Sequence, residues 1–299
     1  MPINYENGVK RPNQEVAFTK EMVLEFAKCA KDVRYFAENY FYILHPTKGK
    51  MLINLFDFQK EMVKNFQDHR FNVVLSARQM GKTTCSSIYL LWFAIFNSEK
   101  TVAILANKQR TAKSIVDDIK AAYKELPDWM KPGITKWDAL NLEFDNDSKI
   151  FASATSEDAL RGESISLLFL DEFAFVPENV ADAFWASNFP TISTGGSIIV
   201  VSTPNGTAGL FYDLYQKAGN QNSPWNRIRV KWDQHPDRDE EWKQEVLNSI
   251  GKVKFQAEFE CILGKTIINV LYNGKEYTVN IGDLYDQGED LLRALSNTN

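Results

Sequence analysis

Apolar runs that predict buried strands recur through the middle of the chain. They lie at residues 73–75, 101–106, 167–170 and 197–202. Each run is continuous rather than alternating, which predicts a parallel sheet that is covered on both faces. Between the runs, residues 83–96 are largely apolar and residues 109–126 have a polar face, so both segments are expected to be helices. This alternation of strand and helix predicts an α/β fold with a doubly wound sheet.

Two segments outside this alternation have patterns of their own. Residues 18–45 place apolar residues at helical spacing, which predicts two short helices with a packed aromatic face. The aromatic stripe at 35–42 is more typical of a core than of a platform for stacked bases. Residues 142–154 alternate around Asn146-Asp147 and are expected to form a hairpin.

The composition is that of an ordinary globular protein. Of the 299 residues 44% are apolar, and the net charge of −5 means that the chain as a whole is not a basic nucleic-acid binder. No apolar run reaches the roughly 18 residues of a membrane helix, so no membrane partner is expected. Cys29, Cys85 and Cys261 are too sparse for a disulfide framework or a zinc site, and they suit a reducing cytosol.

Residues 76–83 match a phosphate-binding loop. They are Ser-Ala-Arg-Gln-Met-Gly-Lys-Thr, and the pattern is G-x-x-x-x-G-K-[ST] with Ser76 in place of the first glycine. The flanking strand and helix argue against a chance match, because the loop must bring backbone N–H groups and a helix N-terminus to the phosphates of ATP. Lys82 is expected to neutralise phosphate oxygens, and Thr83 to ligate Mg²⁺. The residues expected to contact the nucleotide here are Ser76, Arg78, Gln79, Met80, Gly81, Lys82, Thr83 and Thr84.

An acidic pair, Asp171-Glu172, follows the apolar run 167–170. Carboxylates at the end of a central parallel strand lie beside a phosphate loop. Asp171 is expected to hold Mg²⁺ together with Thr83, and Glu172 to orient the attacking water or accept its proton. The pair is weak as an isolated signal and strong together with the loop upstream.

Two polar segments have weaker patterns. Ser202, Thr203 and Asn205 end the last apolar run, where a polar side chain can sense the γ-phosphate, but the same residues are typical of a plain turn. Gln59 precedes the first strand, and its amide has the donors and acceptors that match an adenine edge.

Two arginines, Arg78 in the loop and Arg161 before the acidic pair, are further candidates. Arg78 is expected to contact phosphate or substrate, and Arg161 to reach phosphate or a neighbouring subunit's nucleotide as an arginine finger. For both, the alternative is a solvated surface arginine.

Seven segments together resemble the large terminase subunit of T-even-type tailed phages. They are FDFQ (56–59), SARQMGKTT (76–84), AILANK (103–108), LPDWMKPGI (126–134), SEDALRG (156–162), LLFLDEFAFVP (167–177) and STPNG (202–206). The resemblance is collinear over about residues 30–260, and the unusual Arg-Gln before Met-Gly-Lys-Thr makes it specific. It implies a P-loop (RecA/ASCE-like) ATPase domain at 56–260, with a parallel sheet flanked by helices, after a small helical lid region at 1–55.

The resemblance implies an ATPase that uses ATP and Mg²⁺ to drive double-stranded DNA into a procapsid through the portal protein. Further expected partners are the small terminase subunit and other copies of the chain in a ring on the procapsid. The expected location is the cytoplasm of an infected bacterium and not the mature virion. By this resemblance, the residues that hydrolyse ATP are Lys82, Thr83, Asp171 and Glu172. Gln59 contacts adenine, Arg78 contacts phosphate or couples hydrolysis to movement, and Ser202 and Thr203 form the coupling motif. Nothing after residue 260 resembles the family's RNase H-like nuclease domain, so cutting of DNA is not expected.

A different resemblance begins at Cys261. The short β-rich tail at 261–299, with an Asn-Gly turn at 273–274, resembles the N-terminal half of a split intein. This implies that Cys261 attacks the carbonyl of Glu260, and that a separate C-terminal intein fragment carries the nuclease domain. Lys265 stands where inteins usually have Asp, and the usual Thr/His pair is absent. A divergent terminase linker is the alternative.

Two other functions stay open at this stage. A helicase-like DNA translocase would share the glutamine, the loop and the acidic pair, but it would need arginine motifs in a second RecA-like domain. A nucleotide-binding packaging component without catalysis would not need Glu172.

Overall fold

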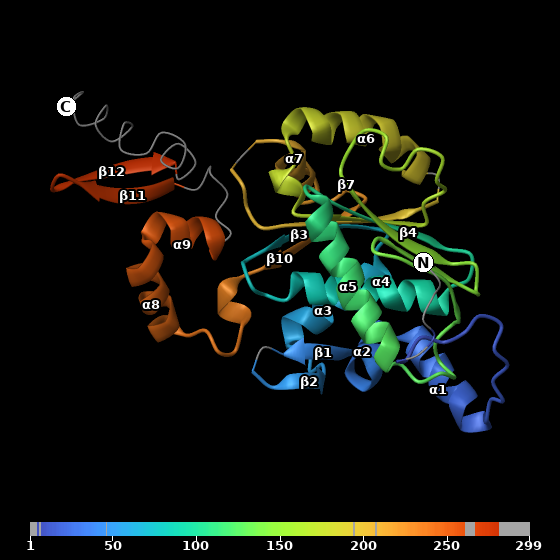
Figure 1. Ribbon diagram of the computed structural model, residues 1–299. Helices are drawn as coiled ribbons and strands as arrows, with labels where there is room; N and C mark the ends of the chain where they lie inside the picture. The colour runs from blue at the N-terminus through green and yellow to red at the C-terminus, as the bar shows by residue number, and fades with distance from the viewer. Residues whose placement is uncertain are drawn as a thin grey trace.

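The computed structural model describes residues 5, 7–45, 47–193, 195–206, 208–260 and 267–280. The body of the protein is an α/β sandwich in which helices cover both faces of one sheet (Figure 1). Cys261 lies outside the described residues, so the structure says nothing of its surroundings.

The central sheet contains eight strands. They are β3 (Phe71–Ser76), β4 (Thr101–Ala106), β5 (Ile134–Trp137), β6 (Asn141–Phe144), β7 (Lys149–Ala154), β8 (Leu167–Asp171), β9 (Ser197–Ser202) and β10 (Trp225–Val230). Their order is β10-β3-β9-β8-β4-β7-β6-β5. All pairs from β10 to β7 are parallel, and β6 and β5 continue the sheet antiparallel. Every residue of β3 and β8 is buried, which confirms the prediction made from their continuous apolar runs.

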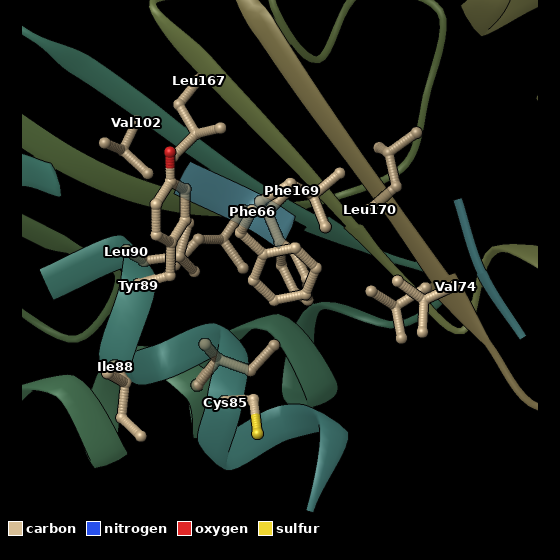
Figure 2. Packing of buried hydrophobic residues seen from close by; sticks show 14 of the residues in the cluster. Phe66, Val74, Cys85, Ile88, Tyr89, Leu90, Val102, Leu167, Phe169 and Leu170 are labelled. Carbon is tan, nitrogen blue, oxygen red and sulfur yellow. The ribbon is translucent and has the colours of Figure 1, made fainter. Parts of the chain in front are cut away.

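Helices cover both faces of the sheet (Figure 1). Figure 1 shows α6 (Glu178–Ser193) and α7 (Leu210–Lys217) above it, and α3 (Asp57–Asp68), α4 (Lys82–Phe96) and α5 (Gln109–Glu125) below it. Most residues of α4 are buried, because it packs between the sheet and its neighbouring helices. In Figure 2, Tyr89 and Leu90 of α4 lie among Val102 of β4, Leu167 of β8 and Phe66 of α3.

The N-terminal region contains α1 (Lys20–Lys31), α2 (Val33–Tyr40) and a hairpin of β1 (Tyr42–His45) and β2 (Gly49–Leu52). The packed aromatic face is confirmed, since the Phe96 ring contacts Phe26 and Phe36 at centroid distances of 4.9 and 5.5 Å. The prediction of helix up to residue 45 was wrong. The run Tyr-Ile-Leu at 42–44 favours a strand, and β2 supplies its hydrogen-bonding partner. None of the described helices is long and apolar enough to cross a membrane.

Several elements escaped the sequence analysis. β10 did so because it is an edge strand with arginines on its exposed side, and α8 (Glu240–Ile250) and α9 (Lys252–Glu258) because their sequence is largely polar. The predicted tail hairpin is confirmed as β11 (Ile267–Tyr272) and β12 (Lys275–Asn280). Its turn residues, Asn273 and Gly274, have φ of 49° and 76°, as a two-residue hairpin turn requires.

Candidate nucleotide site

The carboxyl ends of β3, β9 and β8 lie side by side at one edge of the sheet. β9 lies between the other two, with Ser202 opposite Leu75 of β3 and Val201 opposite Asp171 of β8. The parallel direction therefore brings the loop after β3, the acidic pair after β8 and the polar end of β9 to one place. The three motifs predicted from sequence meet here.

The loop between β3 and α4 has the backbone of an anion cradle. Gln79 and Gly81 have φ of 58° and 74°, in the left-handed region, and α4 begins directly after them. Backbone of this kind directs successive N–H groups toward one side, where the helix N-terminus adds positive potential. A Cβ on Gly81 would lie 2.4 Å from Nε2 of Gln59. Both the φ angle and the close approach therefore require glycine.

Gln59 connects the start of α3 to this loop. Its side chain is buried, Nε2 donates to the carbonyl oxygen of Met80 at 3.2 Å, and Oε1 accepts from the Phe56 N–H at 3.1 Å. The amide thus stabilises the loop from behind, a role that the sequence analysis missed. Contact between Gln59 and adenine stays a prediction.

Glu172 has partners on both carboxylate oxygens. Oε1 lies 2.5 Å from Nζ of Lys82, and Oε2 accepts from Oγ1 of Thr203 at 3.3 Å and from Oγ of Ser202 at 3.5 Å. The φ of Glu172 is 49°, a conformation that costs a residue other than glycine about 1–3 kcal/mol and is concentrated at functional sites. The acid, the loop lysine and the end of β9 therefore form one network.

Asp171 is buried, and its Oδ1 has no hydrogen-bond partner among the described residues. Burial raises the pKa of Asp171 to about 6, with Lys82 opposing the rise and Glu172 adding to it. A buried carboxylate oxygen without a partner fits a hard divalent cation, and Thr83 in the first turn of α4 offers a hydroxyl oxygen. Asp171 and Thr83 are thus suitable residues to hold Mg²⁺.

Ser202 and Asn205 hold the short turn that follows Glu172. Oγ of Ser202 accepts from the Ala174 N–H at 3.2 Å, and Nδ2 of Asn205 donates to the Ala174 carbonyl at 2.9 Å. Together with the bond from Thr203 to Glu172, these contacts make the end of β9 part of the site rather than a plain turn.

The comparison with known families gives this geometry its context. Residues 73–276 match the family described as terminase large subunit, T4likevirus-type, N-terminal. The chain belongs to this family. The match begins in β3 and extends past Cys261 into the tail, and it favours a terminase over the helicase-like alternative.

A curated terminase subunit is also similar to part of the chain. Tripartite terminase subunit 3 of Equine herpesvirus 1 (strain Ab4p) is 27% identical over 194 residues, which are 63% of this chain and 26% of that protein. The chain thus spans about a quarter of the length of the curated relatives that it matches.

Solved terminase structures share the fold. A mutant ATPase domain of the Thermus phage P74-26 large terminase has a TM-score of 0.60 at 19% identity, covering 70% of this chain and 94% of that one. The HK97 bacteriophage large terminase gives 0.59 at 16% identity, covering 80% and 56%. The large terminase of bacteriophage D6E, solved in complex with ADP, gives 0.57 at 13% identity, covering 73% and 56%. The predicted α/β fold is confirmed.

The two predicted arginines of this terminase domain lie in different surroundings. The Arg78 guanidinium pairs with the carboxylate of Glu258 in α9, and the backbone N–H of Arg78 donates to the Glu258 carbonyl oxygen at 3.0 Å. Arg161 is 81% exposed and pairs with Asp158 at 3.2 Å. Among the described residues, no hydrogen bond or ion pair links Arg161 to Lys82 or Glu172. Both nucleotide roles stay predictions.

The remaining predicted residues occupy the loop and the start of α4. Ser76 is buried at the end of β3, Met80 is buried within the loop, and Thr84 lies in the first turn of α4. Cys29 and Cys85 are buried and unbridged.

Sequence reasoning missed Arg238. This arginine lies between two aspartates and resembles an ordinary surface position, yet it is 9% exposed and donates to the phosphate loop. Nothing in a single sequence signals that contact, because the two segments are 160 positions apart.

Proposed function

We propose that this chain is the ATP-hydrolysing motor part of a phage terminase large subunit, and that it drives double-stranded DNA into a procapsid. The observation that carries the proposal is the network at the sheet edge, where Glu172 is bonded both to Lys82 of the phosphate loop and to Thr203. The buried Asp171 lies next to this network in sequence. Family membership and the fold shared with terminase ATPase domains support the same conclusion.

Each of these side chains has a role that its position permits. The loop N–H groups and Lys82 would bind the phosphates, with Lys82 shared between phosphate and Glu172. Glu172 would orient the attacking water or accept its proton. Because Ser202 and Thr203 donate to Glu172, a shift of the β9 end would move the carboxylate, which fits a coupling role.

Asp171, whose Oδ1 has no partner among the described residues, and the hydroxyl of Thr83 would hold Mg²⁺. When bound, the ion would neutralise the charge that collects on the phosphate oxygens. At pH 7.5 a carboxyl whose pKa is about 6 is mostly ionised, so Asp171 can serve as a ligand there.

The proposed partners are double-stranded DNA, the portal protein, the small terminase subunit and further copies of this chain in a ring. The exposed Arg161 is accessible to the nucleotide of a neighbouring copy in such a ring. The proposed location is the cytoplasm of an infected bacterium.

Phosphate release from ATP by the purified full chain tests the proposal. We expect release with Mg²⁺, none in excess EDTA, and slow turnover until procapsids with portal are added. Absence of release at saturating MgATP, in the presence of procapsids and DNA, would contradict the proposal.

We also propose that the tail from Cys261 onward is the N-terminal half of a split intein. The β11–β12 hairpin with its tight Asn-Gly turn supports this, since such a hairpin is part of the block that the tail resembles. Cys261 would attack the Glu260 carbonyl, so that a thioester replaces the amide and the amine of Cys261 is released. The family match up to residue 276 favours the alternative of a divergent terminase linker.

Mass spectrometry of a mixture with a cognate C-terminal intein fragment distinguishes the two. We expect a ligated product that contains residues 1–260 and the segment carried by that fragment. Cys261→Ala is expected to abolish ligation and to leave ATP hydrolysis unchanged. If no ligated product forms under reducing conditions, the tail is a linker.

A further inference from the structure

Three consecutive carbonyl groups of the phosphate loop are bound from behind by two side chains. Arg238 donates from Nη1 to the Arg78 carbonyl at 3.1 Å and from Nη2 to the Gln79 carbonyl at 3.3 Å. Gln59 donates to the next carbonyl, that of Met80. Arg238 also donates to Sδ of Met80 at 3.3 Å. The residue thus spans the turn of the loop from Arg78 to Met80.

These bonds fix the direction of the loop N–H groups. In a planar trans peptide the C=O and N–H groups point in opposite directions. When Arg238 holds the carbonyls of Arg78 and Gln79, the N–H groups of Gln79 and Met80 must face away from it. That is the orientation that an anion cradle requires, and it involves Gln79, whose φ of 58° is unfavourable for a residue other than glycine.

The guanidinium keeps its positive charge uncompensated by any carboxylate of the described residues. Arg238 is 9% exposed, and it forms no ion pair with a described Asp or Glu. Two aromatic rings pack against it instead, with the Trp242 and Phe259 centroids 4.7 and 5.6 Å from Cζ. Burial lowers the pKa of Arg238, but the group stays protonated at neutral pH. The positive charge of Arg238 can therefore attract an anion bound on the other side of the loop.

We propose that Arg238 is a positioning residue of the nucleotide site: it orients the N–H groups of Gln79 and Met80 toward phosphate, and its unpaired charge stabilises that phosphate through the loop. This inference rests on the proposed nucleotide function. The segment before α8 would thus take part in phosphate binding, although it lies far from the phosphate loop in the sequence.

A purely structural role is the alternative, and Arg70 provides the matched control. Arg70 lies directly before β3, at the opposite end of this strand from the loop. It donates to the carbonyls of Gly196 at 2.9 Å and Ser193 at 2.5 Å, and its Cζ lies 4.7 Å from the Phe71 ring centroid. Arg70 therefore has the same kind of bonds as Arg238 but does not contact the loop.

The experiment compares Arg238→Met and Arg238→Lys with Arg70→Met in the full chain. Calorimetry measures MgADP affinity, phosphate release measures KM and kcat for ATP, and thermal unfolding measures stability. Arg238→Met is expected to weaken MgADP binding by about tenfold or more, the loss equivalent to one hydrogen bond, and to raise KM more than it lowers kcat. Arg238→Lys, which keeps the charge, is expected to bind with intermediate affinity. Arg70→Met is expected to lower Tm but to leave affinity and KM unchanged.

Two results would overturn the inference. One is MgADP affinity of Arg238→Met within twofold of the wild type, and the other is an equal loss of affinity in Arg70→Met. If Arg238→Met does not fold, Arg238→Lys decides, and a folded lysine variant with wild-type affinity and KM contradicts the proposal. A wild-type chain that binds no MgADP contradicts the proposed function itself, so the two failures are distinguishable.

Discussion

Two regions of the molecule are stabilised in different ways. One is the sheet edge with Lys82 and Glu172, and the other is the hairpin of β11 and β12. At the edge, side chains from distant parts of the sequence fix each other, as in the bonds of Gln59 and Arg238 to the loop. In the hairpin, two strands joined by a two-residue turn pair as a separate small sheet, and Leu271 is 74% exposed. Substitutions at the edge should therefore affect nucleotide chemistry strongly, and substitutions in the hairpin should not.

The largest effect is expected from Gly81→Ala. The added Cβ would meet Nε2 of Gln59 at 2.4 Å, and the left-handed backbone would be strained as well. We expect MgADP affinity to fall at least about 100-fold, equivalent to nearly 3 kcal/mol. Gly49→Ala is the control, because Gly49 has a φ of 70° but no atom within 4 Å of an added Cβ. Equal nucleotide affinity in the two variants would show that the contact with Gln59 is unimportant.

A smaller effect, a gain in the stability of the fold, is expected from Asp171→Asn. Because burial raises the pKa of Asp171 to about 6, the folded chain keeps a proton that the unfolded chain loses near pH 4. The contribution of Asp171 to stability therefore falls as pH rises from about 4 to about 6 and stays lost above that. Removing the charge should raise the free energy of unfolding at pH 7.5 by about 1–3 kcal/mol, with a smaller gain at pH 5.

Urea unfolding at the two pH values, with and without Mg²⁺, checks this prediction. Mg²⁺ should stabilise the wild type in the presence of ADP but not Asp171→Asn, because the variant lacks the proposed ligand. A variant that is less stable than the wild type at pH 7.5 without Mg²⁺ would contradict the assignment of a buried carboxylate oxygen without a partner.

The smallest effect is expected from Leu271→Ser in the hairpin. The side chain is largely exposed, so the free energy of unfolding should change by no more than about 0.5 kcal/mol, and phosphate release should be unaffected. A large loss of ATP hydrolysis in this variant would mean that the hairpin supports the site, and the contrast between the two regions would fail.

The sequence predicted those parts of the structure that depend on local pattern. The strand 101–106 has the predicted bounds, and Lys82, Glu172 and Thr203 meet because buried parallel strands end together. The edge strand β10 and the helices α8 and α9 lack a continuous apolar pattern and were missed. The contacts of Gln59 and Arg238 with the loop depend on packing between remote segments, which no local pattern encodes.

The central claim is that ATP is hydrolysed at the sheet edge that carries Glu172. A comparison of turnover in Glu172→Gln and Glu163→Gln tests it most directly. Both glutamates lie 2.5 Å from a lysine Nζ, Glu172 from Lys82 and Glu163 from Lys149, and only the first pair belongs to the proposed site. With saturating MgATP, Glu172→Gln is expected to bind nucleotide yet release phosphate at least about 10²-fold more slowly, as when a general base is lost. Glu163→Gln is expected to match the wild type. Unchanged turnover in Glu172→Gln would contradict hydrolysis at this edge of the sheet.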